Sequence, residues 1–290
     1  MIEFERVDTI TLAGGGNRCW WQAGFLEVIA QADLLRARSF SGTSAGAAMA
    51  MALLGGTLSD SIAGCQQGFG ANRSIFGKRR GAWFAQEEIY PAWLRTFVSA
   101  QSLATIKQSG IEIYVGVARL PRAMPSWLST SLGVIAYIAE RNQSAQLPQR
   151  WAHRIGLSIQ LHPLHAISNI DEAIHLLTCA AAAPPFIRSR ILNGEAAVDG
   201  GFANSAPRLP ITDQARNHLV LLTRFDARHP VCFEFEGRTY IQPSKAVPVS
   251  TWDCTYRTDI TAAIDLGRRD AKALIRTRPA GLRVSWRAWL

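Results

Sequence analysis

The chain has 290 residues, 48% of them hydrophobic, which is enough apolar material for one large α/β domain with a sizeable core. No linker, charge run or repeat divides it, so we expect a single domain over residues 1–290. Its motif-bearing core is expected at about 7–275, with a partly helical insert or lid at 58–167. The net charge of +9 either favours an anionic membrane as partner or only aids solubility. Without an RNP-type pattern, zinc-finger spacing or basic helix arm, we expect no nucleic-acid partner.

The cysteines indicate a reducing compartment. Five of them are widely spaced, and no C-x-x-C occurs, which is typical of reduced thiols and not of a disulfide framework. The N-terminal residues contain no apolar signal region, and the longest apolar stretch, 45–54, is too short to span a bilayer. We therefore expect a cytoplasmic protein with at most peripheral contact at the inner membrane surface.

The first 55 residues alternate strand and helix patterns. A β-branched, alternating segment predicts a strand at 7–13, and consecutive glycines interrupt it at 14–16. Helical spacing of apolar residues predicts a helix at 20–35. A short strand at 38–41 and a helix of small residues at 47–54 follow. This order predicts a parallel sheet with right-handed crossovers.

The remaining elements are expected at intervals along the rest of the chain. They are a mainly helical stretch at 58–110, a buried strand at 111–118, helices at 127–141 and 170–183, a hairpin over 191–198 turning at Asn193-Gly194, strands at 218–223 and 238–242, a helix at 259–275 and an edge strand at 282–290.

The strongest chemical signal is the segment Gly42-Thr43-Ser44-Ala45-Gly46. A serine on a sharp strand-to-helix turn has a strained backbone, and glycines two residues away remove the Cβ atoms that would collide with it. The following helix directs its N-terminal amides at developing negative charge. A glycine-flanked serine is often only a tight turn, but the strand before and the helix after favour Ser44 as a nucleophile.

A second glycine-rich segment, Gly14-Gly15-Gly16-Asn17-Arg18, follows the first predicted strand. Its free amides could form a phosphate cradle or an oxyanion hole. A dinucleotide fingerprint would need glycine where Cys19 stands, and no P-loop lysine-serine pair follows. We favour the oxyanion hole because the next strand-turn-helix unit carries Ser44.

The third segment is Asp199-Gly200-Gly201. Taken alone it is an ordinary turn signature. It follows the predicted hairpin, so the aspartate would lie at the end of a strand, and two glycines would let its carboxylate approach another loop. A solvated aspartate has a pKa of ~3.9 and is a poor base at neutral pH. The apolar approach through residues 196–198 would desolvate Asp199 and raise that pKa.

Histidine and metal alternatives have weaker patterns. His218 begins a buried-looking strand, and His229 precedes a proline in a turn, so neither is expected to complete a triad. The pair His162-x-x-His165 has no third ligand and contains Pro163, so we expect no metal site.

Taken in order, the three motifs resemble the patatin-like phospholipase family. The segments 178–185 and 265–271 add to this similarity, although the family loop usually has glycine where this chain has Cys19. The resemblance implies a three-layer α/β/α fold, with a mainly parallel central sheet and helices on both faces. It also implies hydrolysis of phospholipid or other acyl-ester lipids without any cofactor.

The resemblance further implies a role for each motif residue. Ser44 would be the nucleophile and Asp199 the general base of a dyad that works through an acyl-enzyme. The loop Gly14–Asn17, through the amides of Gly15, Gly16 and Asn17, would form the oxyanion hole. The supporting positions are Arg18, Gly42, Gly46, Gly200 and Gly201.

Other functions remain open at this point. An acyltransferase or a general carboxylesterase could use the same dyad, and a non-catalytic lipid-binding or scaffold protein could retain the fold. Arg18 could bind a phosphate headgroup or be an ordinary surface arginine. Basic residues 78–80 beside Trp83 and Phe84 resemble a membrane-interfacial patch, or a solvated charge cluster beside buried aromatic residues.

Overall fold

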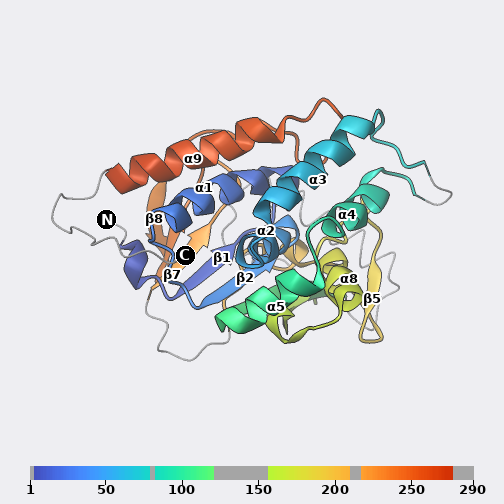
Figure 1. Cartoon of the computed structure of the whole chain (residues 1–290), viewed down its shortest axis with the longest axis horizontal. Helices are drawn as coiled ribbons and strands as arrows, with labels where there is room; N and C mark the ends of the chain where they lie inside the picture. Colours follow the sequence, from blue (N-terminus) through green and yellow to red (C-terminus); the bar gives the residue numbers. More distant parts are fainter. Residues whose placement is uncertain (1–2, 79–81, 121–155, 210–216, 277–290) are drawn as a thin grey trace.

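The computed structural model describes residues 3–78, 82–120, 156–209 and 217–276. Figure 1 shows a twisted sheet with helices lying across it. The predicted helix at 127–141 and edge strand at 282–290 lie outside the described residues.

The first 55 residues fold in the predicted order. Strand β1 (Thr9–Leu12) is followed by helix α1 (Trp20–Gln31), strand β2 (Ser39–Thr43) and helix α2 (Ala45–Leu54). β1 and β2 pair in parallel, with Thr9 opposite Ser39 and Leu12 opposite Gly42. The prediction of a parallel β-α-β unit is therefore confirmed.

The other described elements complete the domain. In chain order they are α3 (Leu58–Ala71), α4 (Gln86–Leu94), α5 (Ala100–Ser109), β3 (Glu112–Arg119), β4 (Ser158–Pro163), α8 (Ile170–Ala180), β5 (Arg190–Leu192), β6 (Glu195–Asp199), β7 (His218–Leu221), β8 (Cys232–Phe235), β9 (Arg238–Ile241) and α9 (Ile260–Arg276), with short 3-10 turns η1 (Phe4–Arg6), η2 (Gly16–Cys19), η3 (Leu164–Ala166) and η4 (Gly200–Phe202). The strands β4 and β8 were not predicted. Both are antiparallel strands with half-exposed or exposed side chains, so neither carries a buried apolar run.

The sheet is mixed, with a parallel centre. β3, β2, β1, β7 and β9 run parallel to one another in that spatial order. Antiparallel strands are added around this centre: β8 on β9, β4 and β6 on β3, and β5 on β6. The predicted α/β class with a mainly parallel central sheet is therefore confirmed.

Two strands meet end to end along one edge of β3. β4 pairs with β3 over residues 114–119, so it occupies one whole edge there. On the other edge β2 pairs first, ending with Thr43 opposite Gly116. From the next residue of β3 onward, the antiparallel β6 pairs with this edge, with Asp199 opposite Val117. The register of β3 thus brings the ends of two strands, distant in sequence, to neighbouring positions.

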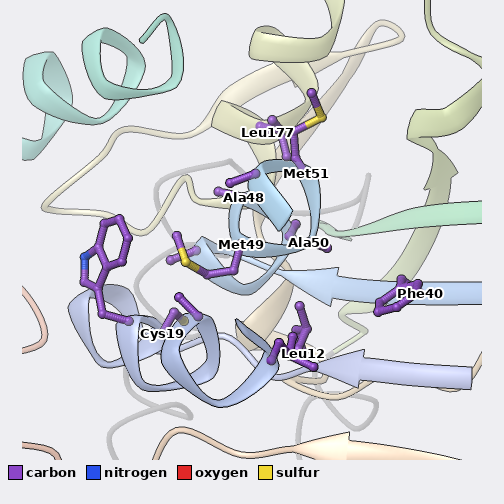
Figure 2. Packing of buried hydrophobic residues seen from close by; sticks show 14 of the residues in the cluster. Leu12, Cys19, Phe40, Ala48, Met49, Ala50, Met51 and Leu177 are labelled. Atoms are coloured by element: carbon purple, nitrogen blue, oxygen red, sulfur yellow. The ribbon is translucent and has the colours of Figure 1, made fainter. Parts of the chain in front are cut away.

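Helix α2 packs against the centre of the sheet. Ile10, Leu12 and Phe40 are buried on the same side in one apolar core with the small residues of α2. Figure 2 shows Met49 on the side of α2 toward Cys19, and Met51 beside Leu177 of α8. Because α2 is mostly alanine, its backbone can lie close to the strands and keep its N-terminus near the sheet edge.

The opposite face of the sheet carries buried polar groups at its centre. Thr11 Oγ1 lies 2.8 Å from Ser41 Oγ and 2.7 Å from His218 Nε2. Burial, together with Arg238 and Arg208, lowers the pKa of His218 to about 3. His218 is therefore a neutral partner of Thr11 at physiological pH, in line with the structural role that the sequence predicts.

Helices α1 and α9 lie alongside each other, as Figure 1 shows. A Cβ atom at Gly24 would lie 2.0 Å from the carbonyl oxygen of Ile264, and one at Gly267 would lie 2.0 Å from that of Trp21. A hydrogen bond of 2.7 Å from Trp21 Nε1 to Asp270 Oδ2 fixes the same crossing. Across the described part of the chain, no helix has the length and apolar character needed to cross a bilayer.

This crossing predicts a cost for a substitution that normally favours helices. Gly267→Ala should lower the free energy of unfolding by about 1–3 kcal/mol, because its methyl group would overlap the Trp21 carbonyl. Gly70→Ala in α3 is the matched control, since nothing lies within 4 Å of its added Cβ, and it should be neutral or stabilising. Urea unfolding measures both. Equal effects would show that the two helices do not approach through these glycines.

Candidate active site

Ser44 lies at the turn between β2 and α2. Its backbone has φ 52° and ψ −139°, a conformation that non-glycine residues rarely adopt. A Cβ at Gly42 would lie 2.6 Å from the Ala47 nitrogen, and one at Gly46 would lie 2.4 Å from the Leu12 carbonyl oxygen. The two flanking glycines are therefore required by close backbone contacts, and the turn leaves Ser44 at the N-terminus of α2, where the helix dipole favours negative charge.

Asp199 ends β6, and the Ser44 side chain lies close enough to its carboxylate to lower the pKa of that carboxylate. Only 5% of Asp199 and 6% of Ser44 is exposed, so the pair is nearly removed from bulk water. The Gly201 amide donates to Asp199 Oδ1 at 2.7 Å. Burial raises the pKa of Asp199 to about 6, although the Ser44 side chain and the Gly201 amide oppose that rise.

The end of α8 and the residues after it hold both residues of this pair by their backbones. The Ser44 amide donates to the Ala180 carbonyl at 3.1 Å, and the Asp199 amide donates to the Ala182 carbonyl at 2.8 Å. Both alanines belong to the small-residue segment 178–185, in which residues 178–183 are buried. Small side chains let this segment pass close to two loops, so one stretch of backbone sets the spacing between Ser44 and Asp199.

A second close contact explains the glycines after Asp199. A Cβ at Gly200 would lie 2.3 Å from the carbonyl oxygen of Gly116 on β3. One at Gly201 would lie 3.0 Å from Asp199 Oδ1. The sequence predicts that these glycines allow a close approach between loops, and the contacts at Gly200 agree with that prediction.

The glycine loop after β1 lies against the Ser44 turn. A Cβ at Gly14 would lie 3.1 Å from Ser44 Cβ, and one at Gly15 would lie 2.1 Å from Thr223 Oγ1. Gly16 has φ +55°, and its Cβ would lie 2.3 Å from the Thr251 carbonyl oxygen. No side chain fits at these positions, so the bare backbone of the loop borders the site.

The loop amides differ in what they bind. The Gly14 amide donates to the Ser205 carbonyl at 3.3 Å and to Thr43 Oγ1 at 3.1 Å. The Asn17 amide donates to the Thr251 carbonyl at 3.2 Å. The Gly14 and Asn17 amides therefore anchor the loop, and an oxyanion hole formed by amides of Gly14–Asn17 stays a prediction.

Asn17 and Cys19 have structural roles in this loop. The Asn17 side-chain amide donates to the carbonyls of Ser250 at 2.9 Å and Asp253 at 2.7 Å, which ties the loop to the segment 250–254. Cys19 is buried, and its Sγ contacts the Ala13 carbonyl at 3.7 Å. A small thiol thus fills the core where the family has glycine. Arg18 is half-buried in η2, and headgroup binding by it stays a prediction.

An apolar pocket opens onto Ser44. Its walls come from the glycine loop, α1, α2, α3, α4 and the segment 251–254. The lining residues are Gly16, Asn17, Cys19, Trp20, Ser44, Ala45, Met49, Cys65, Phe69, Gln86, Ile89, Tyr90, Trp93, Ala181, Ile187, Thr251, Trp252 and Cys254.

The sequence did not predict this pocket, although one signal for it exists. Gln86, Ile89, Tyr90 and Trp93 recur at the spacing of one helix face, and all four line the pocket from α4. Periodicity alone cannot tell a face packed in a core from a face that borders a cavity. The walls meet only through tertiary packing.

The two histidines that follow Asp199 in the chain have other partners. His218 is bonded to Thr11, and His229 stacks on Phe233 with ring centroids 4.6 Å apart. Within residues 3–78, 82–120, 156–209 and 217–276, no group of three histidine, cysteine, aspartate or glutamate side chains is arranged to hold a metal ion.

Comparison with known proteins gives the family. A family model described as patatin-like phospholipase matches residues 10–211, a span that holds the glycine loop, the Ser44 turn and the Asp199 turn. The chain belongs to the patatin-like phospholipase family. Membership in this family places it among the lipid acyl hydrolases, whose substrates are lipid esters.

The fold of this patatin-like protein also resembles a solved structure. It is similar to VipD from Legionella pneumophila, with a TM-score of 0.50 and 12% sequence identity, over 94% of this chain and 67% of that one. At this identity the likeness concerns the fold alone. A comparison with curated protein sequences finds no significant match.

The buried Asp199 carboxylate predicts a pH-dependent stability difference. Its pKa is about 6 in the fold against an ordinary 3.8, so the folded protein binds the proton more tightly than the unfolded chain. Wild-type stability therefore falls as pH rises from about 4 to 6 and stays lower above. The free energy of unfolding of Asp199→Asn minus that of wild type should therefore be roughly 3 kcal/mol larger at pH 8 than at pH 4.

Urea unfolding at both pH values checks this expectation. Glu234→Gln, which changes an exposed carboxylate on β8, is the matched control and should show little pH-dependent difference from wild type. If Asp199→Asn and wild type differed equally at pH 4 and pH 8, the carboxylate would not be held at a raised pKa.

Proposed function

We propose that this protein is a serine hydrolase of lipid acyl esters, with Ser44 as nucleophile and Asp199 as general base. One observation carries the proposal: the fold buries the Asp199 carboxylate beside Ser44, and Ser44 lines an apolar pocket. A serine needs an adjacent base to attack an ester, and Asp199 is the group in that position.

The first half-reaction transfers the acyl group to the enzyme. Ser44 Oγ attacks the ester carbonyl carbon while its proton passes to Asp199. The tetrahedral oxyanion is stabilised by the amides of Gly15 and Gly16 and by the N-terminus of α2. When the ester C–O bond breaks, Asp199 returns the proton to the leaving alcohol, so that acyl-Ser44 and a free alcohol remain.

The raised pKa of Asp199 suits this role. With a pKa of about 6, the carboxylate is mostly ionised at pH 7 and still accepts a proton more readily than a solvated aspartate. Its backbone anchor at Ala182 and its bond from Gly201 fix the side chain toward Ser44. Geometry and basicity therefore support the same assignment.

The second half-reaction releases the acid. Asp199 takes a proton from a water molecule that attacks the acyl-Ser44 carbonyl, and Ser44 regains its proton when the acid leaves. An alcohol in place of water would make the protein an acyltransferase by the same steps. The apolar lining, with Met49, Phe69 and Trp93 among its residues, favours a long acyl chain over a small ester.

Active-site labelling tests the dyad. Wild type should react with a fluorophosphonate probe and release fatty acid from phospholipid, whereas Ser44→Ala should do neither. Asp199→Asn should lower kcat by at least about 100-fold, because the serine loses its base. Mass spectrometry of the labelled peptide and a fatty-acid release assay measure these effects.

Two histidine variants serve as controls. His229→Ala and His218→Ala should each retain most of the esterase activity, since neither ring contacts the dyad in the described structure. Near-complete loss in a folded histidine variant would overturn the dyad. An unlabelled wild type without activity would favour a non-catalytic lipid-binding protein.

A further part of the proposal is peripheral contact with an anionic membrane through the loop between α3 and α4. In the aromatic loop, residues 75–84 with 79–81 outside the described residues, exposed fractions are 42% for Ile75, 61% for Phe76 and 75% for Trp83. Exposed aromatic side chains beside basic ones are typical of interfacial anchors. Arg73 lies beside the loop, 4.5 Å from the Tyr256 ring centroid.

The aromatic loop is connected to the pocket by stacked rings. Phe76 stacks on Phe84 at 6.0 Å, Phe84 packs on Phe186 at 4.7 Å, and Phe186 stacks on Trp252 at 4.5 Å between centroids. Trp252 lines the pocket. A membrane bound at the loop would therefore lie next to the entrance through which a lipid reaches Ser44.

Vesicle flotation tests this contact. Wild type should float with vesicles of anionic phospholipid at low salt and dissociate as salt rises. The double variant Phe76→Ala/Trp83→Ala should bind at least 10-fold more weakly, because two apolar side chains can no longer enter the interface. Phe225→Ala, which removes a 41% exposed ring after β7, is the control. Absence of binding at low salt would remove the membrane part of the proposal.

A further inference from the structure

Two of the pocket's polar side chains lie on α4, away from the Ser44 turn and the glycine loop. Gln86 and Tyr90 both line the pocket from α4, four residues apart and so on the same helix face. Gln86 is only 8% exposed. Their neighbours on this face, Ile89 and Trp93, are apolar. A pocket for an unsubstituted hydrocarbon chain would need no polar side chains at these two positions.

The polar atoms of this pair are buried without hydrogen-bond partners in the described structure. They are Gln86 Oε1, Gln86 Nε2 and the Tyr90 hydroxyl. Buried polar groups in proteins are nearly always hydrogen-bonded, so unpaired groups that line a binding pocket point to a polar group on the ligand. Trp93, by contrast, bonds its Nε1 to the Ser61 carbonyl at 2.8 Å and needs nothing from a ligand.

A lipid in the pocket packs against two polar side chains whose polar atoms are buried without partners. A saturated acyl chain would leave these groups unpaired. A chain that carries an oxygen function at this level would supply the missing hydrogen bonds and keep its apolar contacts with Ile89 and Trp93.

The donor and acceptor set selects a hydroxyl. Gln86 offers one acceptor and one amide donor group, and Tyr90 offers a phenol. Burial, with Asp199 and Cys19 nearby, raises the pKa of Tyr90 well above its usual value, so the phenol stays a neutral donor. A hydroxyl both donates and accepts, so it can bond to Gln86 Oε1 and accept from Tyr90 or Gln86 Nε2.

Tyr90 lines the same pocket as Ser44, the residue at which the proposed function cleaves the ester. A hydroxyl bonded to Tyr90 is therefore expected close to the ester. We propose that Gln86 and Tyr90 are specificity-determining residues that select acyl chains with a hydroxyl group on one of the first few carbons. This inference rests on the proposed function only in taking the pocket as the acyl site.

Equilibrium binding tests the inference without catalysis. The Ser44→Ala variant is titrated with decanoic, 3-hydroxydecanoic and 10-hydroxydecanoic acids, and the fluorescence of pocket tryptophans such as Trp20 and Trp93 reports occupancy. We expect 3-hydroxydecanoic acid to bind about 10-fold more tightly than the other two. In Gln86→Leu and Tyr90→Phe, added separately to Ser44→Ala, this preference should shrink to about 2-fold or less, with decanoic acid bound at least as well.

The matched control is Ile89→Leu on the same helix face, which should keep the full preference for 3-hydroxydecanoic acid. Equal binding of decanoic and 3-hydroxydecanoic acids, or a preference that survives in both polar variants, overturns the inference. Stronger binding of the 10-hydroxy acid overturns the placement near the ester.

A hydrolysis arm separates this inference from the proposed function. Wild type is given monoacylglycerols with decanoyl or 3-hydroxydecanoyl chains. Faster release of the hydroxy acid in wild type, lost in Gln86→Leu and Tyr90→Phe, supports both proposals. Equal rates overturn the inference and leave the hydrolase intact. No hydrolysis of either ester, with the binding preference present, overturns the hydrolase and supports the selective pocket.

Discussion

Burial of the Asp199 carboxylate next to Ser44 is the constraint on which the rest of the site depends. A carboxylate removed from water is costly, and here the Gly201 amide donates a hydrogen bond to it while the nearby Ser44 side chain also lowers its pKa. The fold maintains it by ending β2 and β6 at adjacent positions on one edge of β3. Both backbones are then tied to the end of α8 and the residues after it. The same desolvation that destabilises the protein gives the aspartate the basicity that ester cleavage needs.

Close backbone approach is the second theme of this structure. Glycines 42, 46 and 200 each stand where a methyl group would overlap a neighbouring backbone atom, and alanines fill α2 and the segment 178–185. These small residues hold three loops within contact of one another. Side-chain chemistry is therefore confined to Ser44 and Asp199, while the surrounding loops contribute backbone amides and carbonyls.

Local signals explain what could be predicted from the sequence. The glycine patterns around Ser44 and before Asn17 dictate turns by sterics alone, and alternation or helical spacing gives most strands and helices. The strands β4 and β8 lack a buried run and were missed. The Gly14 and Asn17 amides donate to the carbonyls of Ser205 and Thr251, which are more than 180 positions away in the sequence. Only the three-dimensional structure shows that these two amides are already hydrogen-bonded. The same holds for the pocket walls.

One wall of the pocket comes from a different part of the chain than Ser44 and Asp199. Ser44, Asp199 and the glycine loop stand on the sheet, whereas α3 and α4, between β2 and β3 in sequence, supply the wall with Phe69, Gln86 and Tyr90. Reactivity and selectivity are thus encoded in separable stretches. If both proposals hold, changes in α4 alter which acyl chain is accepted without moving Ser44 or Asp199, so one scaffold acquires new lipid preferences through two helices.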